Sequence, residues 1–430
     1  MDHTEEYQAK LATVDDALAS VRSGEQLCTG GVLCEPLAFL ERFQEIVPRL
    51  EDVELLKGRN IDVPFLFMPD LREHVTVLGH LYDATLRSCA KNGAITHMPS
   101  NLHDFMPNRV SYRPIDRFIA AAAPMDENGD FAVSGCGMWE YTAARNAKHI
   151  ILEVNPLLPR FRGSLKVNIR QVDMLYEAPR PATEYPRAVS TETDRTIGQT
   201  IASLVNDGDC IQIGIGGMPD AVARAFMDKR DLGLHTELFT PAVGELIEAG
   251  VITGRRKNVD RGEHVGSFVM GDHKLYDTLA RDPNVRFDDI TYTNSPRVIA
   301  SIDNMVSINT AMEIDLTGQI CSESIGPVQY SGTGGAFDFA FGAMHSRGGR
   351  SIIAIASTAK HGTLSKITAQ LTPGAVVSIP RNAADIVVTE FGVAYLRGRS
   401  VRERTQNLIA VAHPDFREEL RAAAKKLNWI

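Results

Sequence analysis

Residues 212–250 read QIGIGGMPDAVARAFMDKRDLGLHTELFTPAVGELIEAG. This stretch predicts a strand, a glycine turn, a helix and then a second strand that carries Glu237. A glycine turn before a helix presents peptide N–H groups to an anion or an oxyanion. A carboxylate at the end of the following strand can act as a nucleophile. The rest of the chain is organised around this pairing of a glycine turn with an acid.

Three interpretations fit the glycine turn, which comprises Gly214, Ile215, Gly216, Gly217, Met218 and Pro219. The first is the dinucleotide fingerprint G-x-G-x-x-G, with Glu237 spaced to bind a ribose hydroxyl. However, Pro219 stands in place of the third glycine, and proline suits the first turn of a helix. The second is a tight turn with a structural role. We favour the third, a turn whose N–H groups face a bound anion or a thioester oxygen.

The composition is that of an ordinary globular chain of 430 residues, 44% hydrophobic and 23% charged. Because this length is large for one hydrophobic core, we expect two domains. The net charge of −9 and the lack of a basic block argue against nucleic acid as a partner. The N-terminus is polar and acidic, and no apolar run approaches about 18 residues. We therefore expect no signal peptide, no membrane span and a cytoplasmic location.

The six cysteines form no C-x-x-C pair, and most lie in apolar surroundings. We expect them to be reduced core residues in a reducing compartment. No His or Cys pair has ligand spacing, so no metal site is expected. The motif G-x-S-x-G is absent, which argues against a serine nucleophile of the α/β-hydrolase kind.

Apolar runs that alternate with helical patterns predict an α/β fold with a mostly parallel sheet. We expect helices over 6–22, 36–47 and 139–146, and strands over 26–29, 75–78, 93–97, 118–124 and 149–154. Proline and arginine are frequent after residue 155, and we expect an interdomain linker over 170–190. The predicted domains are therefore residues 1–180 and 190–430.

Internal sequence matches suggest that the two domains are duplicates of one another. The matches pair 17–27 with 201–211, 126–131 with 315–320, and 149–154 with 385–390. The first two have the similar offsets of 184 and 189, whereas the third requires an insertion in the second half. The third match pairs the strands HIILEV and DIVVTE, which both end near an acid.

Ligands of open α/β sheets bind at the carboxyl ends of the strands. The glycine turn at 214, Glu237, a second glycine cluster over 332–335 and Lys360 are all expected at such ends or in loops. Lys360 is either a solvated lysine or a contact for a phosphate or pantetheine group. Three arginines either form a solvated face or bind a substrate carboxylate; they are Arg109, Arg113 and Arg117.

Several segments in one order match a known family. They are GIGGMPDAV, LGLHTELF and LIEAGVITG in the central stretch, VNPLLPR at 154–160, SGTGGAFDF at 331–339, STAKHGTLSKI at 357–367 and ADIVVTEFGVAYLRG at 384–398. The chain resembles the acetyl-CoA hydrolase/transferase family of class I CoA-transferases, and its 4-hydroxybutyrate, butyrate and acetate CoA-transferase branch most closely. The resemblance implies two similar open, mostly parallel α/β domains of the NagB/RpiA-like CoA-transferase fold, with the active site between them.

The resemblance also implies roles for individual residues. Glu237 matches the catalytic glutamate, and Gly214 to Met218 match the loop that contacts CoA beside the thioester. Gly332, Gly335 and Lys360 are implied to bind CoA. The chain departs from the family at Gly217, at Ala336 and over GGVLCEP (30–36), where the acyl pocket is expected. CoA is then a substrate, no cofactor is bound permanently, and a homodimer or larger homo-oligomer is expected.

The implied activity is a ping-pong CoA transfer from a short-chain acyl-CoA to a free carboxylic acid through a glutamyl-CoA thioester at Glu237. The acids of this branch are of the 4-hydroxybutyrate, butyrate or acetate type, and a dicarboxylate such as itaconate or succinate is expected if Arg113 faces the pocket. Two alternatives are open. One is an acyl-CoA hydrolase that uses the same glutamate, and the other is a nucleotide-binding metabolite sensor.

Overall fold

The computed structural model describes residues 2–58 and 63–430. These residues form two compact units. Unit 1 comprises Met1–Tyr185 and Ser267–Thr291, and unit 2 comprises Pro186–Gly266 and Tyr292–Ile430. The segment Ser267–Thr291 therefore belongs to unit 1, which the predicted division into 1–180 and 190–430 did not anticipate.

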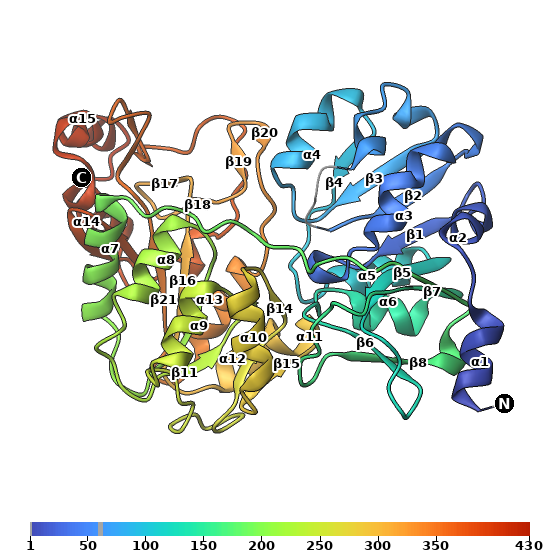
Figure 1. The fold of residues 1–430 in the computed structure, drawn as a ribbon. Helices are drawn as coiled ribbons and strands as arrows, with labels where there is room; N and C mark the ends of the chain where they lie inside the picture. The colour runs from blue at the N-terminus through green and yellow to red at the C-terminus, as the bar shows by residue number, and fades with distance from the viewer. Residues whose placement is uncertain (1, 59–62) are drawn as a thin grey trace. The chain divides into compact units, whose positions relative to one another are not determined.

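Unit 1 contains a seven-stranded sheet in the order β4-β3-β2-β1-β5-β7-β9, and every neighbouring pair is parallel (Figure 1). Its strands are β1 (Gln26–Thr29), β2 (Val53–Leu56), β3 (Val75–Gly79), β4 (Ile95–His97), β5 (Arg117–Ala122), β7 (His149–Val154) and β9 (Met174–Glu177). The antiparallel pair β6 (Asp130–Val133) and β8 (Leu165–Asn168) lies beside this sheet in the same unit, where β6 contacts β5.

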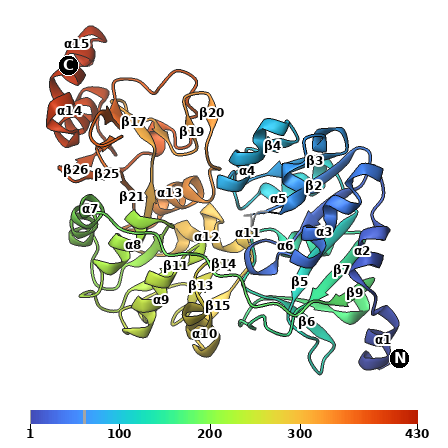
Figure 2. The same ribbon diagram turned by 45° about the horizontal axis from the view of Figure 1, so that its top comes forward.

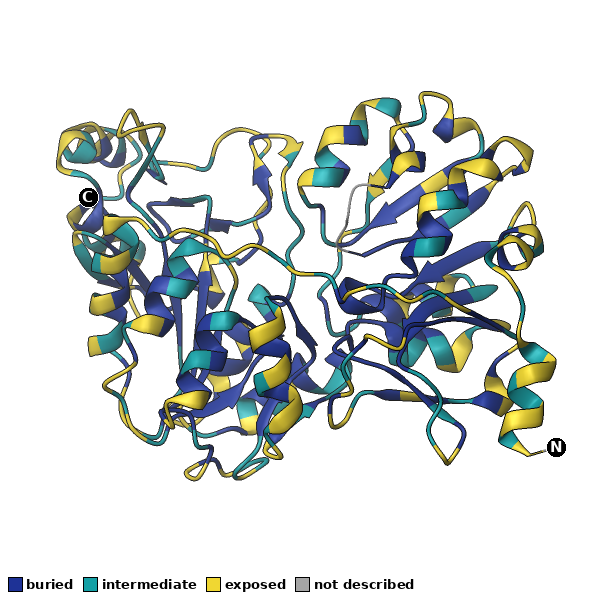
Figure 3. Cartoon of the chain, in the orientation of Figure 1, coloured by how far each residue is buried: buried dark blue, intermediate teal, exposed yellow. Residues whose placement is uncertain are grey.

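The helices of unit 1 are α1 (His3–Lys10), α2 (Val14–Ser20), α3 (Leu37–Arg42), α4 (Ala84–Cys89), α5 (Phe105–Tyr112), α6 (Glu140–Asn146) and α10 (His273–Arg281). Side chains from α2 and α3 form one core with β1, β2 and β3, in which Phe39 and Phe43 are fully buried. The strands are accordingly buried over most of their length (Figure 3). This burial on both faces explains the continuous apolar runs from which parallel strands were predicted.

The strands that unit 2 contributes to a second sheet follow the order β13-β11-β10-β16-β21-β25-β26. These strands are β10 (Cys210–Ile213), β11 (Gly233–His235), β13 (His264–Gly266), β16 (Met305–Thr310), β21 (Arg350–Ala354), β25 (Ile386–Thr389) and β26 (Gly392–Tyr395). All neighbouring pairs are parallel except β25 and β26. The predicted α/β fold with mostly parallel sheets is therefore confirmed.

The helices of unit 2 are α7 (Glu192–Ser203), α8 (Gly217–Arg224), α9 (Pro241–Glu248), α12 (Pro296–Ser301), α13 (Ala336–His345), α14 (Val401–Val411) and α15 (Arg417–Lys426). Helices α7 and α8 lie side by side, as do α14 and α15 (Figures 1 and 2). Short strands connect these elements: β17 (Glu313–Asp315), β18 (Ile320–Cys321), β19 (Ser324–Ile325), β20 (Val328–Gln329), β22 (Thr358–Ala359), β23 (Leu364–Ser365) and β24 (Ile367–Thr368).

Several predicted elements differ from those in the structure. The helix expected over 6–22 is interrupted after Lys10, and a new helix begins after Thr13, whose side chain forms a capping box with Asp16. The linker expected over 170–190 contains β9, an edge strand of the first sheet. This strand was not predicted because it has only four residues and prolines follow it closely, at 179 and 181.

The two sheets have corresponding strand orders, which supports the predicted duplication. Strand β1 is flanked by β2 and β5 as β10 is flanked by β11 and β16. In unit 1, Arg117 of β5 pairs with Leu27 and His149. In unit 2, Val306 of β16 pairs in the same way with Ile211 and Arg350. By this correspondence β7 matches β21, and β25 matches β9. The predicted pairing of 149–154 with 385–390 is therefore wrong, because a strand that ends near an acid carries no information about its neighbours in the sheet.

The predicted match of 126–131 with 315–320 is confirmed by the same hydrogen bonds in both segments. In each unit an aspartate accepts the peptide N–H groups two and four residues further on, at 2.9 and 3.0 Å, and the two residues are Asp126 and Asp315. Each turn contains a glycine in the left-handed region, Gly129 with φ 80° and Gly318 with φ 96°. An aspartate that caps its own turn and a glycine with positive φ are together a strong turn signal.

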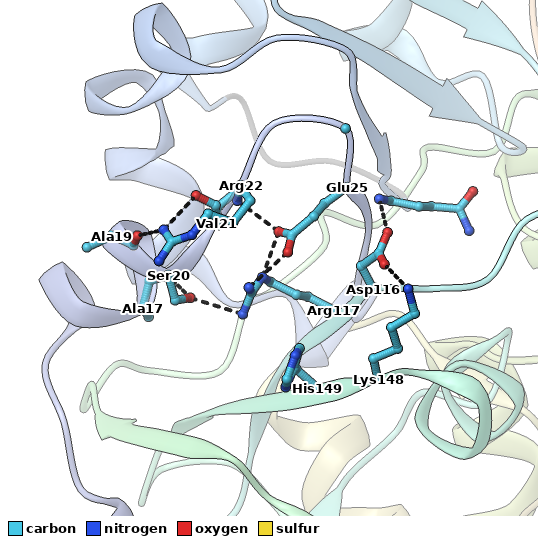
Figure 4. Close-up of polar contacts among 12 residues, drawn as sticks. Ala17, Ala19, Ser20, Val21, Arg22, Glu25, Asp116, Arg117, Lys148 and His149 are labelled. Carbon is cyan, nitrogen blue, oxygen red and sulfur yellow. Dashed lines mark hydrogen bonds and ion pairs between the residues drawn. The ribbon is translucent and has the colours of Figure 1, made fainter.

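Polar contacts fix the amino ends of β1 and β5 in unit 1 (Figure 4). Glu25 accepts two hydrogen bonds from the Arg117 guanidinium, at 2.7 and 2.9 Å, and one from the peptide N–H of Arg22 at 2.9 Å. Asp116 accepts the peptide N–H of Gln26 at 2.7 Å. Ligands of such sheets bind at the carboxyl ends of the strands, and these contacts lie at the opposite end.

We predict that Asp315→Ala destabilises the protein more than Asp126→Ala. Asp315 is 1% exposed and also accepts hydrogen bonds from the Thr317 hydroxyl and the Gln319 amide, so its loss leaves buried donors unpaired. We expect a loss of about 3 kcal/mol for Asp315→Ala and about 1 kcal/mol for Asp126→Ala, measured by urea unfolding. Equal losses would contradict the importance of burial at this turn.

Candidate active site

The glycine turn and Glu237 leave the sheet of unit 2 at the same edge. Strands β10 and β11 are parallel neighbours, with Cys210 opposite Gly233 and Ile211 opposite Leu234. Continuing this register brings Gly214 opposite Glu237, just beyond the carboxyl ends of both strands. The spacing in sequence therefore has a simple structural cause, because two parallel strands of similar length deliver their next residues to one place.

Glu237 is a partly buried carboxylate with two hydrogen-bond donors. The side-chain amide of Asn294 donates to Oε2 at 2.8 Å, and the peptide N–H of Gly335 donates to the same carboxylate. Burial raises the pKa of Glu237 to about 7, and the nearby Asp338 carboxylate adds to this effect. The two donors oppose the rise, because hydrogen bonds to a carboxylate stabilise its charged form. Near neutral pH the group therefore exchanges readily between its two protonation states.

Gly335 is required at its position because a larger residue would clash with Glu237 and Asn294. A Cβ atom there would lie 2.0 Å from Oε2 of Glu237 and 2.1 Å from Nδ2 of Asn294. Its φ of −94° is accessible to any residue, so backbone conformation is no reason for glycine here. The preceding Gly334 differs, because its φ of 53° lies in the left-handed region. Both glycines belong to the second cluster that the sequence singled out.

Asn294 is held beside Glu237 through contacts with His235, the last residue of β11. His235, two residues before Glu237 in β11, is fully buried, and its Nε2 lies 2.8 Å from the carbonyl oxygen of Thr293. The Thr293 hydroxyl in turn donates to the side-chain carbonyl of Asn294 at 3.2 Å. This contact directs the Asn294 amide group toward the carboxylate. Sequence reasoning missed these partners, because Asn294 lies 57 residues from Glu237 and stands in no recognisable pattern.

The glycines of the first turn have different structural roles. Gly216 is the N-cap of α8, with a φ of 124° that only glycine adopts without strain. Gly217 is the first residue of α8, and a Cβ there would lie 2.6 Å from the carbonyl oxygen of Val189. Ile215, which directly precedes Gly216, is 43% exposed. The turn thus brings the N-terminus of α8 to the edge where Glu237 lies, while Gly214 to Met218 as CoA contacts stay a prediction.

The other predicted ligand residues lie in loops of unit 2. Gly332 lies between β20 and α13, three residues before Gly335. Lys360 is exposed at the turn between β22 and β23, with a φ of 49°. His361 and Gly362 of the same turn also have positive φ, 56° and 88°. Contact of Gly332 or Lys360 with CoA stays a prediction.

The arginine cluster of unit 1 is engaged by acids of its own unit. Arg113 lies 2.7 Å from the Glu54 carboxylate, which also contacts Arg109, and Arg117 binds Glu25. Glu54 and Glu25 lie at the amino ends of β2 and β1, opposite to the edge where ligands bind. The interpretation of these arginines as a site for a substrate carboxylate is therefore wrong. Partners more than 50 residues away in the chain neutralise them, and local sequence cannot reveal such pairs.

Two kinds of feature are absent from residues 2–58 and 63–430. No helix within these ranges has the length and apolarity needed to cross a membrane. No group of three or more His, Cys, Asp or Glu side chains in them is arranged to hold a metal ion. The six cysteines are all buried free thiols.

Comparison with known proteins identifies the family. Residues 1–186 match the acetyl-CoA hydrolase/transferase N-terminal domain, and residues 271–424 match the C-terminal domain of the same family. The chain is 38% identical to succinyl-CoA:cyclohexane-1-carboxylate CoA transferase of Geobacter metallireducens, over 100% of this chain and 98% of that protein. It is 36% identical to 4-hydroxybutyrate coenzyme A transferase of Clostridium kluyveri, over 99% and 100% of the two chains.

A solved structure agrees with these sequence relatives. The crystal structure of RipA from Yersinia pestis superposes with a TM-score of 0.94 at 36% identity, over 100% of both chains. The chain therefore belongs to the acetyl-CoA hydrolase/transferase family. The predicted enzyme class, a CoA-transferase, is confirmed by the full-length relatives.

We predict that Gly335→Ala inactivates the enzyme without unfolding it. The added Cβ must displace the Glu237 carboxylate or the Asn294 amide, and a displacement of about 1 Å costs about 10²-fold in kcat. The backbone conformation suits alanine, so the thermal unfolding temperature should change little. Steady-state kinetics and a thermal scan of the same preparation check both parts, and wild-type kcat in the variant would contradict the geometry described here.

Proposed function

We propose that this enzyme transfers CoA between a short-chain acyl-CoA and a free carboxylic acid, with Glu237 as the covalent nucleophile. The observation that carries the proposal is the placement of Glu237 between two hydrogen-bond donors at the carboxyl edge of a parallel sheet. A nucleophile needs a defined orientation, and a developing oxyanion needs donors already in place. Both requirements are met at one carboxylate.

The reaction begins when a Glu237 oxygen attacks the carbonyl carbon of the acyl-CoA. The carbon–sulfur bond breaks, which gives an acyl-glutamyl anhydride and CoA thiolate. The thiolate then attacks the glutamyl carbonyl carbon, so the anhydride breaks and the first acid leaves as its carboxylate. The product is a glutamyl-CoA thioester. The acceptor carboxylate repeats these steps in reverse order and regenerates Glu237, with no net change in protons or electrons.

Asn294 and Gly335 are the donors that serve the glutamyl carbonyl in this scheme. Negative charge develops on a glutamyl oxygen each time the thiolate or the acceptor attacks, and both donors already contact this carboxylate. Each such donor contributes about 3 kcal/mol to the stability of an oxyanion. The N–H groups of Gly214 to Met218 are placed in the same scheme beside the thioester oxygen of the acyl-CoA. Gly332, Gly335 and Lys360 are proposed to contact CoA.

The proposed substrates follow from the relatives. Their names include succinyl-CoA with cyclohexane-1-carboxylate in one relative, and 4-hydroxybutyrate in the other. We expect a small acid of this range as acceptor and an acyl-CoA as donor. Because a thioester is exchanged for a thioester, the scheme requires neither ATP nor a permanently bound cofactor.

A second activity, hydrolysis of the acyl-CoA, uses the same nucleophile. It is favoured by the partial exposure of Glu237, since water that reaches the glutamyl thioester releases CoA. The two activities differ in their products. Transfer converts the acceptor acid into a new acyl-CoA, whereas hydrolysis releases free thiol without any acceptor, so both products should be quantified in one assay.

We predict that transfer depends on an ionised Glu237. The raised pKa means that the carboxylate is formed as pH rises through about 7, so kcat/KM should increase tenfold per unit below that value and level off above it. Glu237→Gln should lower kcat by at least about 10⁴-fold at every pH. The measurement is the rate of new acyl-CoA formation between pH 5 and 9. Substantial transfer by Glu237→Gln would refute the nucleophile.

A further inference from the structure

The hydrogen bond from Gly335 to Glu237 depends on the position of one loop. After β20 the chain passes through residues 330–335 and enters α13. Thr333 begins a turn here, because its carbonyl oxygen accepts the peptide N–H of Ala336 at 3.4 Å. Gly334 and Gly335 are the two residues inside this turn. The position of Thr333 therefore determines where the Gly335 N–H points.

The buried side chain of Glu323 holds this loop. Glu323 directly precedes β19 and is 4% exposed. Its backbone carbonyl oxygen accepts the N–H groups of Tyr330 and Ser331, at 2.8 and 2.9 Å. Its Oε2 accepts the Thr333 hydroxyl and the Gln329 amide, each at 3.3 Å. One residue thus binds the loop through both its backbone and its side chain.

The other carboxylate oxygen of Glu323 is attached to the framework of the unit. Oε1 accepts the hydroxyl of Ser378 at 2.8 Å. Ser378 is itself fixed, because its peptide N–H donates to Ile320 of β18 at 2.9 Å and its hydroxyl oxygen accepts the N–H of Ser322 at 3.0 Å. Glu323 therefore connects a fixed strand to the loop, with one oxygen on each side.

We propose that Glu323 is a positioning residue, which acts through Thr333 to hold the Gly335 N–H against the Glu237 carboxylate. A carboxylate suits this position because one oxygen accepts on each side, and Glu323→Gln can preserve the connection because the Thr333 and Ser378 hydroxyls can accept as well as donate. This inference rests on the proposed role of Glu237 as nucleophile. It assigns a function to a buried acid that takes no part in the covalent steps.

The test compares pairs of variants. Glu323→Leu and Thr333→Val remove the connection, whereas Glu323→Gln and Thr333→Ser retain an acceptor and a hydroxyl. We expect the first pair to lower kcat about tenfold to a hundredfold, and the second pair to recover most of it. Thr253→Val is the matched control, because it removes a threonine–carboxylate hydrogen bond of 3.0 Å, to Asp231, at the amino end of β11.

The pH dependence of kcat/KM distinguishes a positioning role of Glu323 from a loss of protein stability. When the Gly335 N–H moves away, the Glu237 carboxylate loses a stabilising donor, and the rise of kcat/KM should shift to higher pH by about half a unit. A variant that is only less stable gives lower activity with an unshifted profile. Thr253→Val should leave both kcat and the profile unchanged.

Hydrogen–deuterium exchange gives a readout that needs no substrate. Peptides that cover residues 330–336 should exchange faster in Glu323→Leu and Thr333→Val than in the wild type and in Thr253→Val. Unchanged exchange together with an unshifted profile in both variants would overturn the role of Glu323, whatever their kcat. A wild-type enzyme that transfers no CoA would overturn the proposed function instead, and the exchange data alone would then decide the role of Glu323 in the loop.

Discussion

The proposed chemistry depends on a carboxylate, Glu237, that is partly removed from water at the carboxyl edge of a parallel sheet. Removal from water raises the free energy of the charged form of Glu237, and the hydrogen bonds from Asn294 and Gly335 restore only part of this loss, so the pKa is raised to about 7. The remaining penalty makes the carboxylate more reactive than one in solution. It also makes the positions of Asn294 and Gly335 important, because these two donors stabilise the charged form.

The fold supplies this arrangement by a simple geometric rule. Parallel strands end at one edge, so residues that follow β10 and β11 meet although 23 residues separate their paired positions. Unit 1 repeats the strand order and the aspartate-capped turn, and it has Gly58 at the place that corresponds to Glu237. Duplication therefore accounts for the scaffold, while the acid and its donors distinguish unit 2.

Part of this structure was predictable from sequence because it is local. Strand lengths, the glycine turn, the aspartate-capped turns and the position of Glu237 are all encoded within windows of about ten residues. Asn294 was not predictable, since it reaches Glu237 from 57 positions away through contacts with Thr293 and His235. The interpretation of the arginine cluster as a substrate site was wrong for the same reason, because Arg113 is paired with Glu54, a residue distant from it in the sequence. The strand β9 was missed because it has four residues and a proline-rich segment follows it.

The most direct test of the account is to trap the covalent enzyme. The protein is incubated with an acyl-CoA without acceptor acid, treated with borohydride, and digested for mass spectrometry. A glutamyl thioester at Glu237 is reduced to the alcohol, so we predict a single modified peptide that contains residue 237 and is absent when acyl-CoA is omitted. Active enzyme that yields no modified peptide, or one modified at another residue, would contradict the account.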